Sequence, residues 1–223
     1  MIHPYLKKLE DQLQMQGNPV IASGAKAYLR NQFEFFGVKA PERRYILAAF
    51  LKSEGLPKQT EFEPVMKSAW EHPCREMQYV SMEIASKMRK HFTSESIDLL
   101  EYLICNKSWW DTVDYIAPQL VSSYFMNFPE MQAETIDKWM ASGNIWLQRS
   151  CLLFQLKAKD KTDETLLYQL IKELAAHPDF FIRKAIGWAL REHAKRNPES
   201  VKHFVDSTAL SVLSKREALK HIG

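Results

Sequence analysis

Apolar residues recur along this chain at the spacing of amphipathic helices, and no stretch shows the strict alternation of a β-strand. Behind Pro4, which suits the first turn of a helix, Leu6, Leu9 and Leu13 form one apolar stripe. Residues 19–23 are expected to connect this helix to a short one. Further helix starts are marked by a proline or an N-capping residue, at Pro41, Pro64, Thr93, Ser94, Pro129 and Asn197. The pattern predicts an all-α protein of about a dozen helices.

A repeat of about 35 residues organises these helices. His72 and His177 are each followed by proline and then by a long apolar helix, and they lie 105 residues apart. Dividing this interval by three predicts further helix starts at 108–110 and 144–146. One repeat position is then shared, in steps of 35, 36 and 34 residues, by Gln78, Val113, Arg149 and Arg183. Such a period is typical of an α-solenoid of stacked HEAT-like helix pairs, so we expect residues 1–223 to form one domain with a concave groove.

The composition is that of a soluble, helix-rich globular protein. Hydrophobic residues make up 46% and charged residues 26% of the 223 residues, and only seven residues are glycine. No stretch approaches the roughly 20 apolar residues of a membrane span. The N-terminus also lacks the apolar segment of a signal peptide. We therefore expect a cytoplasmic protein that makes no membrane contact.

The cysteines and histidines show no ligand or disulfide pattern. Cys74, Cys105 and Cys151 are odd in number and widely spaced, and the chain has neither a CxxC nor an HExxH motif. We expect buried, reduced thiols. Neither a metal nor an organic cofactor is expected.

Charge is distributed unevenly along the chain. Residues 1–140 carry 16 Lys/Arg and 18 Asp/Glu, a net charge of −2, whereas residues 141–223 carry 14 and 9, a net charge of +5. A basic C-terminal half is compatible with a polyanionic partner. Solvated helices give the same pattern, so this observation leaves both interpretations open.

The stretch with the most distinctive chemistry is Trp-Trp-Asp-Thr-Val-Asp at 109–114. On a helix, Trp110 and Asp114 are four residues apart and project from one face, which sets an indole beside a carboxylate. This pair suits a cation or a cation-like transition state, although tryptophans in the core and a solvated acid are the alternative. In the repeat register, Trp110 and Asp114 converge on one groove with Arg149, Arg183 and Trp188, which favours a functional site.

Four stretches together resemble the AlkD family of DNA glycosylases, bacterial HEAT-like-repeat enzymes that excise alkylated bases. They are FFGVKAPERR at 35–44, WWDTVD at 109–114, WLQRS at 146–150 and FFIRKAIGWALRE at 180–192. The resemblance implies hydrolysis of the N-glycosidic bond of cationic lesions such as 3-methyladenine and 7-methylguanine in duplex DNA. It also implies that the damaged base need not be flipped into a pocket, unlike in most glycosylases.

The resemblance assigns Trp110, Asp114 and Trp188 to a constellation that lies against the deoxyribose of the lesion. An alkylated purine already carries positive charge and leaves without a general acid, so the site has only to stabilise an oxocarbenium-like sugar and position water. An ionised Asp114 suits both tasks, and indole faces attract cations. The alternative for Asp114 is a helix cap or a bridge to a neighbouring helix. Phe180 and Phe181 are expected to pack in the core or between repeats.

Four further residues are candidates for DNA binding. The resemblance places Arg149 at the DNA backbone and Tyr28 near the DNA. Arg183 shares the repeat register with Arg149 and is expected near phosphates, and Lys157 begins a basic run that can reach the backbone. The alternatives are structural salt bridges for the two arginines, a solvated lysine, and a tyrosine in the core whose hydroxyl is satisfied.

The resulting prediction is a monomeric glycosylase whose partner is double-stranded DNA containing alkylated bases. One rival is a DNA-binding relative without catalytic activity. The other is a protein-binding helical-repeat scaffold, a frequent use of such folds.

Overall fold

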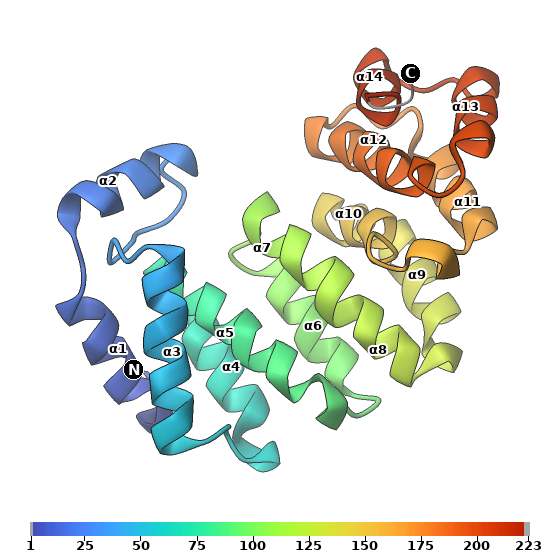
Figure 1. Ribbon diagram of the computed structural model, residues 1–223. Coiled ribbons are helices and arrows are strands. Elements are labelled where there is room, and N and C mark those ends of the chain that lie inside the picture. Colours follow the sequence, from blue (N-terminus) through green and yellow to red (C-terminus); the bar gives the residue numbers. More distant parts are fainter. Residues whose placement is uncertain (1, 221–223) are drawn as a thin grey trace. The chain divides into compact units, whose positions relative to one another are not determined.

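The computed structural model describes residues 2–220, and within this range the regular secondary structure is helical apart from one isolated bridge between Glu34 and Cys74 (Figure 1). The all-α prediction is confirmed. The α-helices are α1 (Pro4–Met15), α2 (Pro19–Tyr28), α3 (Ala40–Glu54), α4 (Phe62–Glu71), α5 (Arg75–Met88), α6 (Ser96–Cys105), α7 (Trp110–Ile116), α8 (Ser122–Asn127), α9 (Gln132–Ala141), α10 (Ile145–Leu153), α11 (Glu164–Leu174), α12 (Phe180–Ala194), α13 (Pro198–Ser207) and α14 (Val212–Ala218).

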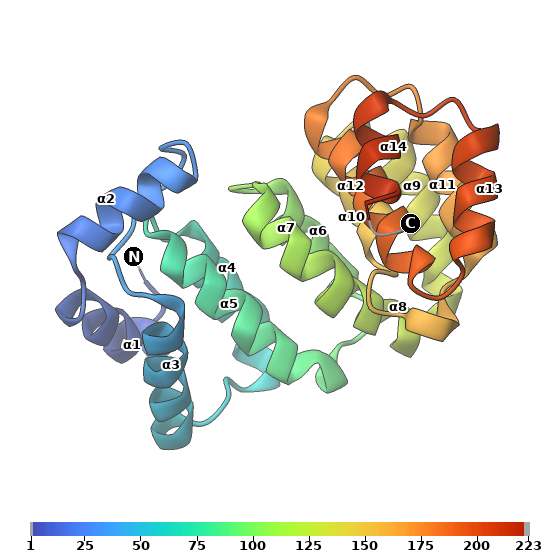
Figure 2. The same cartoon turned by 45° about the horizontal axis from the view of Figure 1, so that its top comes forward.

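The chain divides into two compact units, one ending at Phe92 and the other beginning at Thr93. In the first unit α1 packs against α3 and α4, and α4 packs against α5. Residues 19–23 lie inside α2 rather than in a connector, because Asn18 caps the helix and Pro19 begins it. In the second unit α12 packs against α10, α13 and α14 (Figure 2).

The repeat is confirmed by the positions at which four helices begin. Helices α5, α7, α10 and α12 have as N-cap residues Cys74, Trp109, Asn144 and Asp179, which follow one another at intervals of 35 residues. Each of these helices is the second of a pair, after α4, α6, α9 and α11 respectively. The predicted architecture of repeated helix pairs is therefore present.

Hydrogen bonds show why the two histidines mark the repeat. The Nδ1 atoms of His72 and His177 each accept the backbone N–H two residues later, at 3.0 and 3.1 Å. The carbonyl oxygens of the same histidines accept hydrogen bonds from Gln78 Nε2 and Arg183 Nε, at 2.7 and 2.9 Å. Gln78 and Arg183 thus close the connection between the paired helices in the same way, and they occupy equivalent positions as predicted.

The predicted register is wrong by one residue at Arg149. Gln148 donates to the carbonyl oxygen eight residues earlier at 3.0 Å, as Gln78 does at 2.7 Å. Gln148 is therefore the residue that matches Gln78. Counted in steps of 35, Arg149 instead shares its repeat position with Asp114 and Lys184.

A π-helical turn, Ala117–Val121, joins α7 to α8 and keeps the two segments in one continuous helix. Its cause is Pro118, which has no N–H to donate to the carbonyl group of Asp114 four residues earlier. The apolar helical run expected after the two tryptophans is present, with a local widening that begins at Ala117, three residues after Asp114.

Three further observations limit the chemistry of the molecule. None of the helices in residues 2–220 is long and apolar enough to cross a membrane. Nor does that range contain a group of three or more His, Cys, Asp or Glu side chains that is arranged to hold a metal ion. Cys74, Cys105 and Cys151 form no disulfide, but only Cys151 is buried as expected, whereas Cys74 and Cys105 are partly exposed. Burial raises the pKa of the Cys151 thiol to about 12, so this thiol stays protonated at neutral pH.

Candidate active site

A pocket of about 240 Å³ lies in the second unit, between α7, α10, α12 and α14. Its lining residues are Trp110, Asp114, Arg149, Phe180, Phe181, Lys184, Trp188, Arg191 and Glu217. The expected meeting of Trp110, Asp114, Arg149 and Trp188 is therefore observed. Arg183, which was expected to join them, is not among the lining residues.

An ion pair between Asp114 and Arg149 forms the floor of the pocket. Arg149 Nε donates to Asp114 Oδ1 at 2.8 Å, and Nη2 donates to Oδ2 at 2.9 Å, a two-point contact that fixes the plane of the carboxylate. Arg149 Nη1 donates to the main-chain oxygen of Phe181. The arginine side chain is only 5% exposed, whereas that of Asp114 is 18% exposed. Arg149 thus joins α7, α10 and α12 and presents the carboxylate to the pocket.

Burial and charge act on Asp114 in opposite directions. Burial raises the pKa of Asp114 above its ordinary value, the hydrogen bonds and charge of Arg149 oppose this rise, and the charge of Asp111 adds to it. Such a contact with a guanidinium favours the ionised form, so we infer that Asp114 is a carboxylate at neutral pH.

An aromatic cluster supports this ion pair. The ring centroids of Trp109, Trp146 and Phe181 lie 5.0–5.8 Å from one another. Phe181 is half-buried and packs between repeats, which was one of the two predicted possibilities, and its carbonyl group accepts from Arg149. Phe180 is 53% exposed at the pocket, which excludes the core position that was one of its two predicted possibilities, and its ring makes an edge contact with Phe181 at 5.5 Å.

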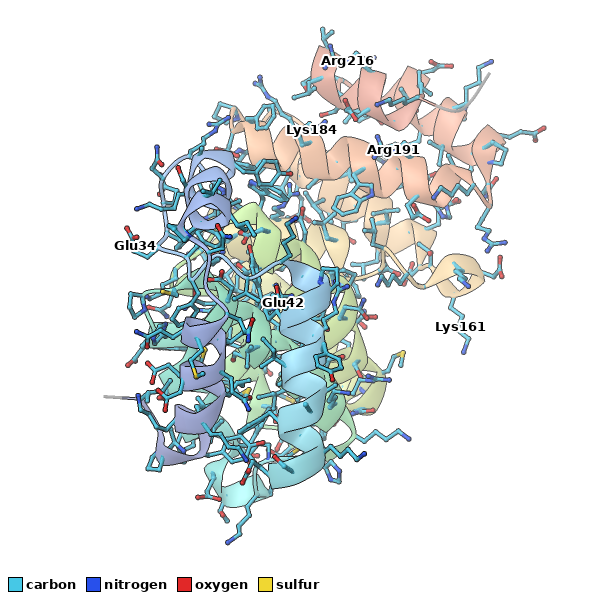
Figure 3. The ribbon with its side chains drawn as sticks, turned by 60° about the vertical axis from the view of Figure 1, so that its left-hand side comes forward. Glu34, Glu42, Lys161, Lys184, Arg191 and Arg216 are labelled. Carbon is cyan, nitrogen blue, oxygen red and sulfur yellow. The ribbon has the colours of Figure 1, made fainter. Side chains whose placement is uncertain are left out.

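A second charged cluster lines the pocket on the side of α12 and α14. Lys184 and Arg191 come from α12 (Figure 3). Glu217 of α14 accepts from Lys184 Nζ at 3.1 Å and from Arg191 Nη1 at 2.8 Å. The contact with Lys184, followed by that with Arg191, lowers the pKa of Glu217, although burial opposes this effect.

The other candidate residues lie away from this pocket. Arg183 is half-buried, and its Nε atom donates to the carbonyl oxygen of His177 at 2.9 Å, so its observed role is structural. Lys157 is exposed just beyond α10. Tyr28 belongs to the first unit, where it is the last residue of α2 and is 72% exposed, in contrast to the alternative of a core tyrosine. The expected DNA contacts of these residues stay predictions.

Three residues of the pocket were not predicted from the sequence: Lys184, Arg191 and Glu217. A signal existed for the first two, because Lys184, Trp188 and Arg191 follow a spacing of four and three residues along one helical face. No comparable signal marked Glu217, since it reaches the pocket only through the packing of α14 on α12.

Comparisons with known proteins agree with this architecture. The family model of DNA alkylation repair enzymes matches residues 9–222. A solved structure described as a predicted DNA alkylation repair enzyme from Enterococcus faecalis is 30% identical, with a TM-score of 0.86, over 93% of this chain and 97% of that chain. None of the curated proteins matches the chain. Because the family model spans nearly all of the sequence, the chain belongs to the family of DNA alkylation repair enzymes.

Proposed function

We propose that the protein is a DNA glycosylase that releases positively charged alkylated purines, such as 3-methyladenine and 7-methylguanine, from duplex DNA. The observation that carries this proposal is the carboxylate of Asp114, oriented by Arg149 in a pocket that it shares with Trp110 and Trp188. Membership of a DNA alkylation repair family supports the same class of substrate.

Release of a cationic base requires a group that stabilises positive charge on the sugar, and a carboxylate in the pocket can do this. Alkylation at N3 or N7 places a positive charge on the purine and weakens its glycosidic bond, so the base departs as a neutral molecule without protonation. Positive charge then develops on the deoxyribose, and water adds to it. A fixed carboxylate stabilises that charge, as in glycoside hydrolysis.

The contacts of Asp114 leave room for this role. Each carboxylate oxygen accepts one hydrogen bond from Arg149, and each has a second lone pair available for water. The carboxylate is partly exposed, and both of its oxygens are held by the same guanidinium, so it needs no reorganisation during the reaction. We infer that Asp114 stabilises the sugar cation and orients the attacking water.

The two tryptophans suit the same transition state. Indole faces attract a cation by about 0.5–2 kcal/mol each. We therefore assign Trp110 and Trp188 to contact with the sugar or with the charged base. We expect the base to remain in the helix stack while the deoxyribose is placed against the carboxylate.

Binding to DNA is expected to depend mainly on phosphate contacts and hence on salt. Arg149 is buried and engaged at three of its nitrogens, so its main assigned role is to orient Asp114. Arg183, Lys157 and Tyr28 are proposed as further contacts of a protein that acts as a monomer without a cofactor.

The test is release of 7-methylguanine and 3-methyladenine from methylated duplex DNA, after subtraction of spontaneous loss. Asp114→Asn should bind DNA like the wild type and release base at least about tenfold more slowly, because the electrostatic stabiliser is lost. Asp137→Asn is the matched control: it makes the same change at an exposed residue of α9, outside the pocket lining. Equal rates for wild type and Asp114→Asn would remove Asp114 from the mechanism.

Two further measurements test whether the reaction is restricted to charged bases and whether the protein is catalytic. Duplex DNA containing uracil should not release its base. Uracil is uncharged in DNA and would have to depart as an anion, since this proposal includes no group to protonate it. Robust uracil release would contradict the proposed chemistry. If the wild type releases no base at all but shifts methylated DNA in a gel, the protein is a non-catalytic DNA reader instead.

A further inference from the structure

The cluster of Lys184, Arg191 and Glu217 has no role in the proposed reaction, although it lines the same pocket. Glu217 contacts both cations with different oxygens, Oε1 with Lys184 and Oε2 with Arg191. Its side chain is only 11% exposed, compared with 36% for Lys184 and 23% for Arg191. Arg216 approaches the same carboxylate from the solvent side at 4.0 Å (Figure 3). A buried acid therefore holds two more exposed cations at the pocket wall.

The approach of α14 to α12 depends on the absence of a side chain at Gly187. A Cβ atom at this position would lie 2.5 Å from Glu217 Cβ and 2.9 Å from the carbonyl oxygen of Ser214. Both distances are far below ordinary contact, so only glycine permits this packing. The close approach is what brings the carboxylate of Glu217 between Lys184 and Arg191.

Glu217 lowers the net positive charge of the residues that line the pocket. Three lining residues are cations, and Asp114 compensates Arg149 by direct contact. Without Glu217, Lys184 and Arg191 would both be uncompensated beside a substrate that is itself positive. With Glu217 the five charged lining residues carry three positive and two negative charges, a net charge of +1. The lower positive charge of the lining weakens the repulsion between the pocket and a sugar cation.

We propose that Glu217 is a positioning residue that sets the charge of the pocket wall, by holding Lys184 and Arg191 in place and cancelling part of their positive charge. This inference rests on the proposed function, since it concerns a cationic transition state. In this role Glu217 lets the pocket wall bind DNA phosphates and also accept a positively charged transition state. The wall keeps N–H donors for DNA phosphates, yet it does not repel the positive charge that develops next to Asp114.

The inference predicts opposite effects on binding and on base release. Glu217→Gln keeps the shape of the side chain and removes its charge. Undamaged duplex DNA should bind as tightly as to the wild type or more tightly, and the salt dependence of binding should steepen by up to about one unit of slope. Release of 7-methylguanine at saturating enzyme should fall about three- to tenfold, because the wall now opposes the transition state.

Two variants separate this role from simple packing. Glu199→Gln makes the same change at an exposed position of α13, outside the pocket lining, and should leave both measurements unchanged. Glu217→Asp keeps the charge with a shorter side chain, so its release rate should lie closer to the wild type than that of Glu217→Gln. Melting temperatures of all variants are measured alongside.

The inference would be contradicted if Glu217→Gln affected DNA binding and base release in the same direction. If Glu217→Gln lowers DNA binding, base release and melting temperature together, or changes none of them, the inference is overturned and the cluster only joins α12 to α14. If the wild type releases no base, the proposed function is refuted independently of Glu217. The role of Glu217 is then tested by the binding of undamaged duplex DNA alone. An unchanged salt dependence of binding in Glu217→Gln would refute its control of the wall charge.

Discussion

Replacing Arg149 with glutamine tests how the pocket orients its carboxylate. The change removes the two hydrogen bonds to Asp114 and the bond to the carbonyl oxygen of Phe181, and it leaves a mostly buried acid without its counter-charge. Removing one partner of a buried ion pair costs about 3–5 kcal/mol, but the 18% exposure of Asp114 allows water to screen part of this. We expect Arg149→Gln to lose about 2–4 kcal/mol of unfolding free energy at neutral pH.

This loss should depend on pH in a defined direction. Burial already raises the pKa of Asp114, and the guanidinium of Arg149 opposes that rise. Without the guanidinium the folded-state pKa rises further above that of the unfolded chain. The folded variant then retains its proton to higher pH, so its stability falls as the pH increases through this window. The stability gap between wild type and variant should therefore narrow on acidification from about pH 7 to pH 4.

Base release should follow the same titration. Because the proposed reaction uses ionised Asp114, the acid limb of the rate profile should move up by about one to two pH units in Arg149→Gln. Denaturant unfolding and single-turnover release are measured from pH 4.5 to 8, with the exposed Arg196→Gln as the matched control. A rate that falls by the same factor at every pH, together with a constant stability gap, would refute the coupling of Arg149 to Asp114.

Two other predictions follow from the pocket. Trp110→Ala and Trp188→Ala should each slow base release while leaving the circular-dichroism melt cooperative, because both side chains line the pocket rather than the core; a collapsed melt would make them structural. Gly187→Ala should lower unfolding free energy by about 1–3 kcal/mol through overpacking against Glu217 and Ser214, and it should reproduce the binding and release pattern of Glu217→Gln; wild-type melting and rates would show that α14 adjusts freely.

The helices and their period could be predicted because their signals are local. Asn144 and Asp179 are strong N-cap residues, and each accepts hydrogen bonds from the first turn of its helix. A spacing of four residues on one helix likewise sets Trp110 beside Asp114. Such features depend only on neighbouring residues, and sequence reasoning located them correctly.

What could not be predicted depends on contacts between helices. Repeats of low identity align almost as well at 36 residues as at 35, and only the hydrogen bond of Gln148 shows that Arg149 lies one position later. In this register Arg149 contacts Asp114, and its predicted contact with the DNA backbone stays a prediction. Glu217 lies 26 residues after Arg191, and its place depends on helix packing that no local pattern records.

Three charged residues of the pocket lie at the same distance in sequence from the N-caps of their helices. Asp114, Arg149 and Lys184 each lie five residues after the N-cap of their helices, α7, α10 and α12. An extra residue in the loop before Asn144 would leave this count intact, since the cap and the helix move together. An extra residue inside the first turn of α10 would rotate Arg149 by about 100° and separate it from its acid. We therefore expect the arrangement of Asp114, Arg149 and Lys184 to survive changes of loop length, but not the gain or loss of a residue within the first five residues of these helices.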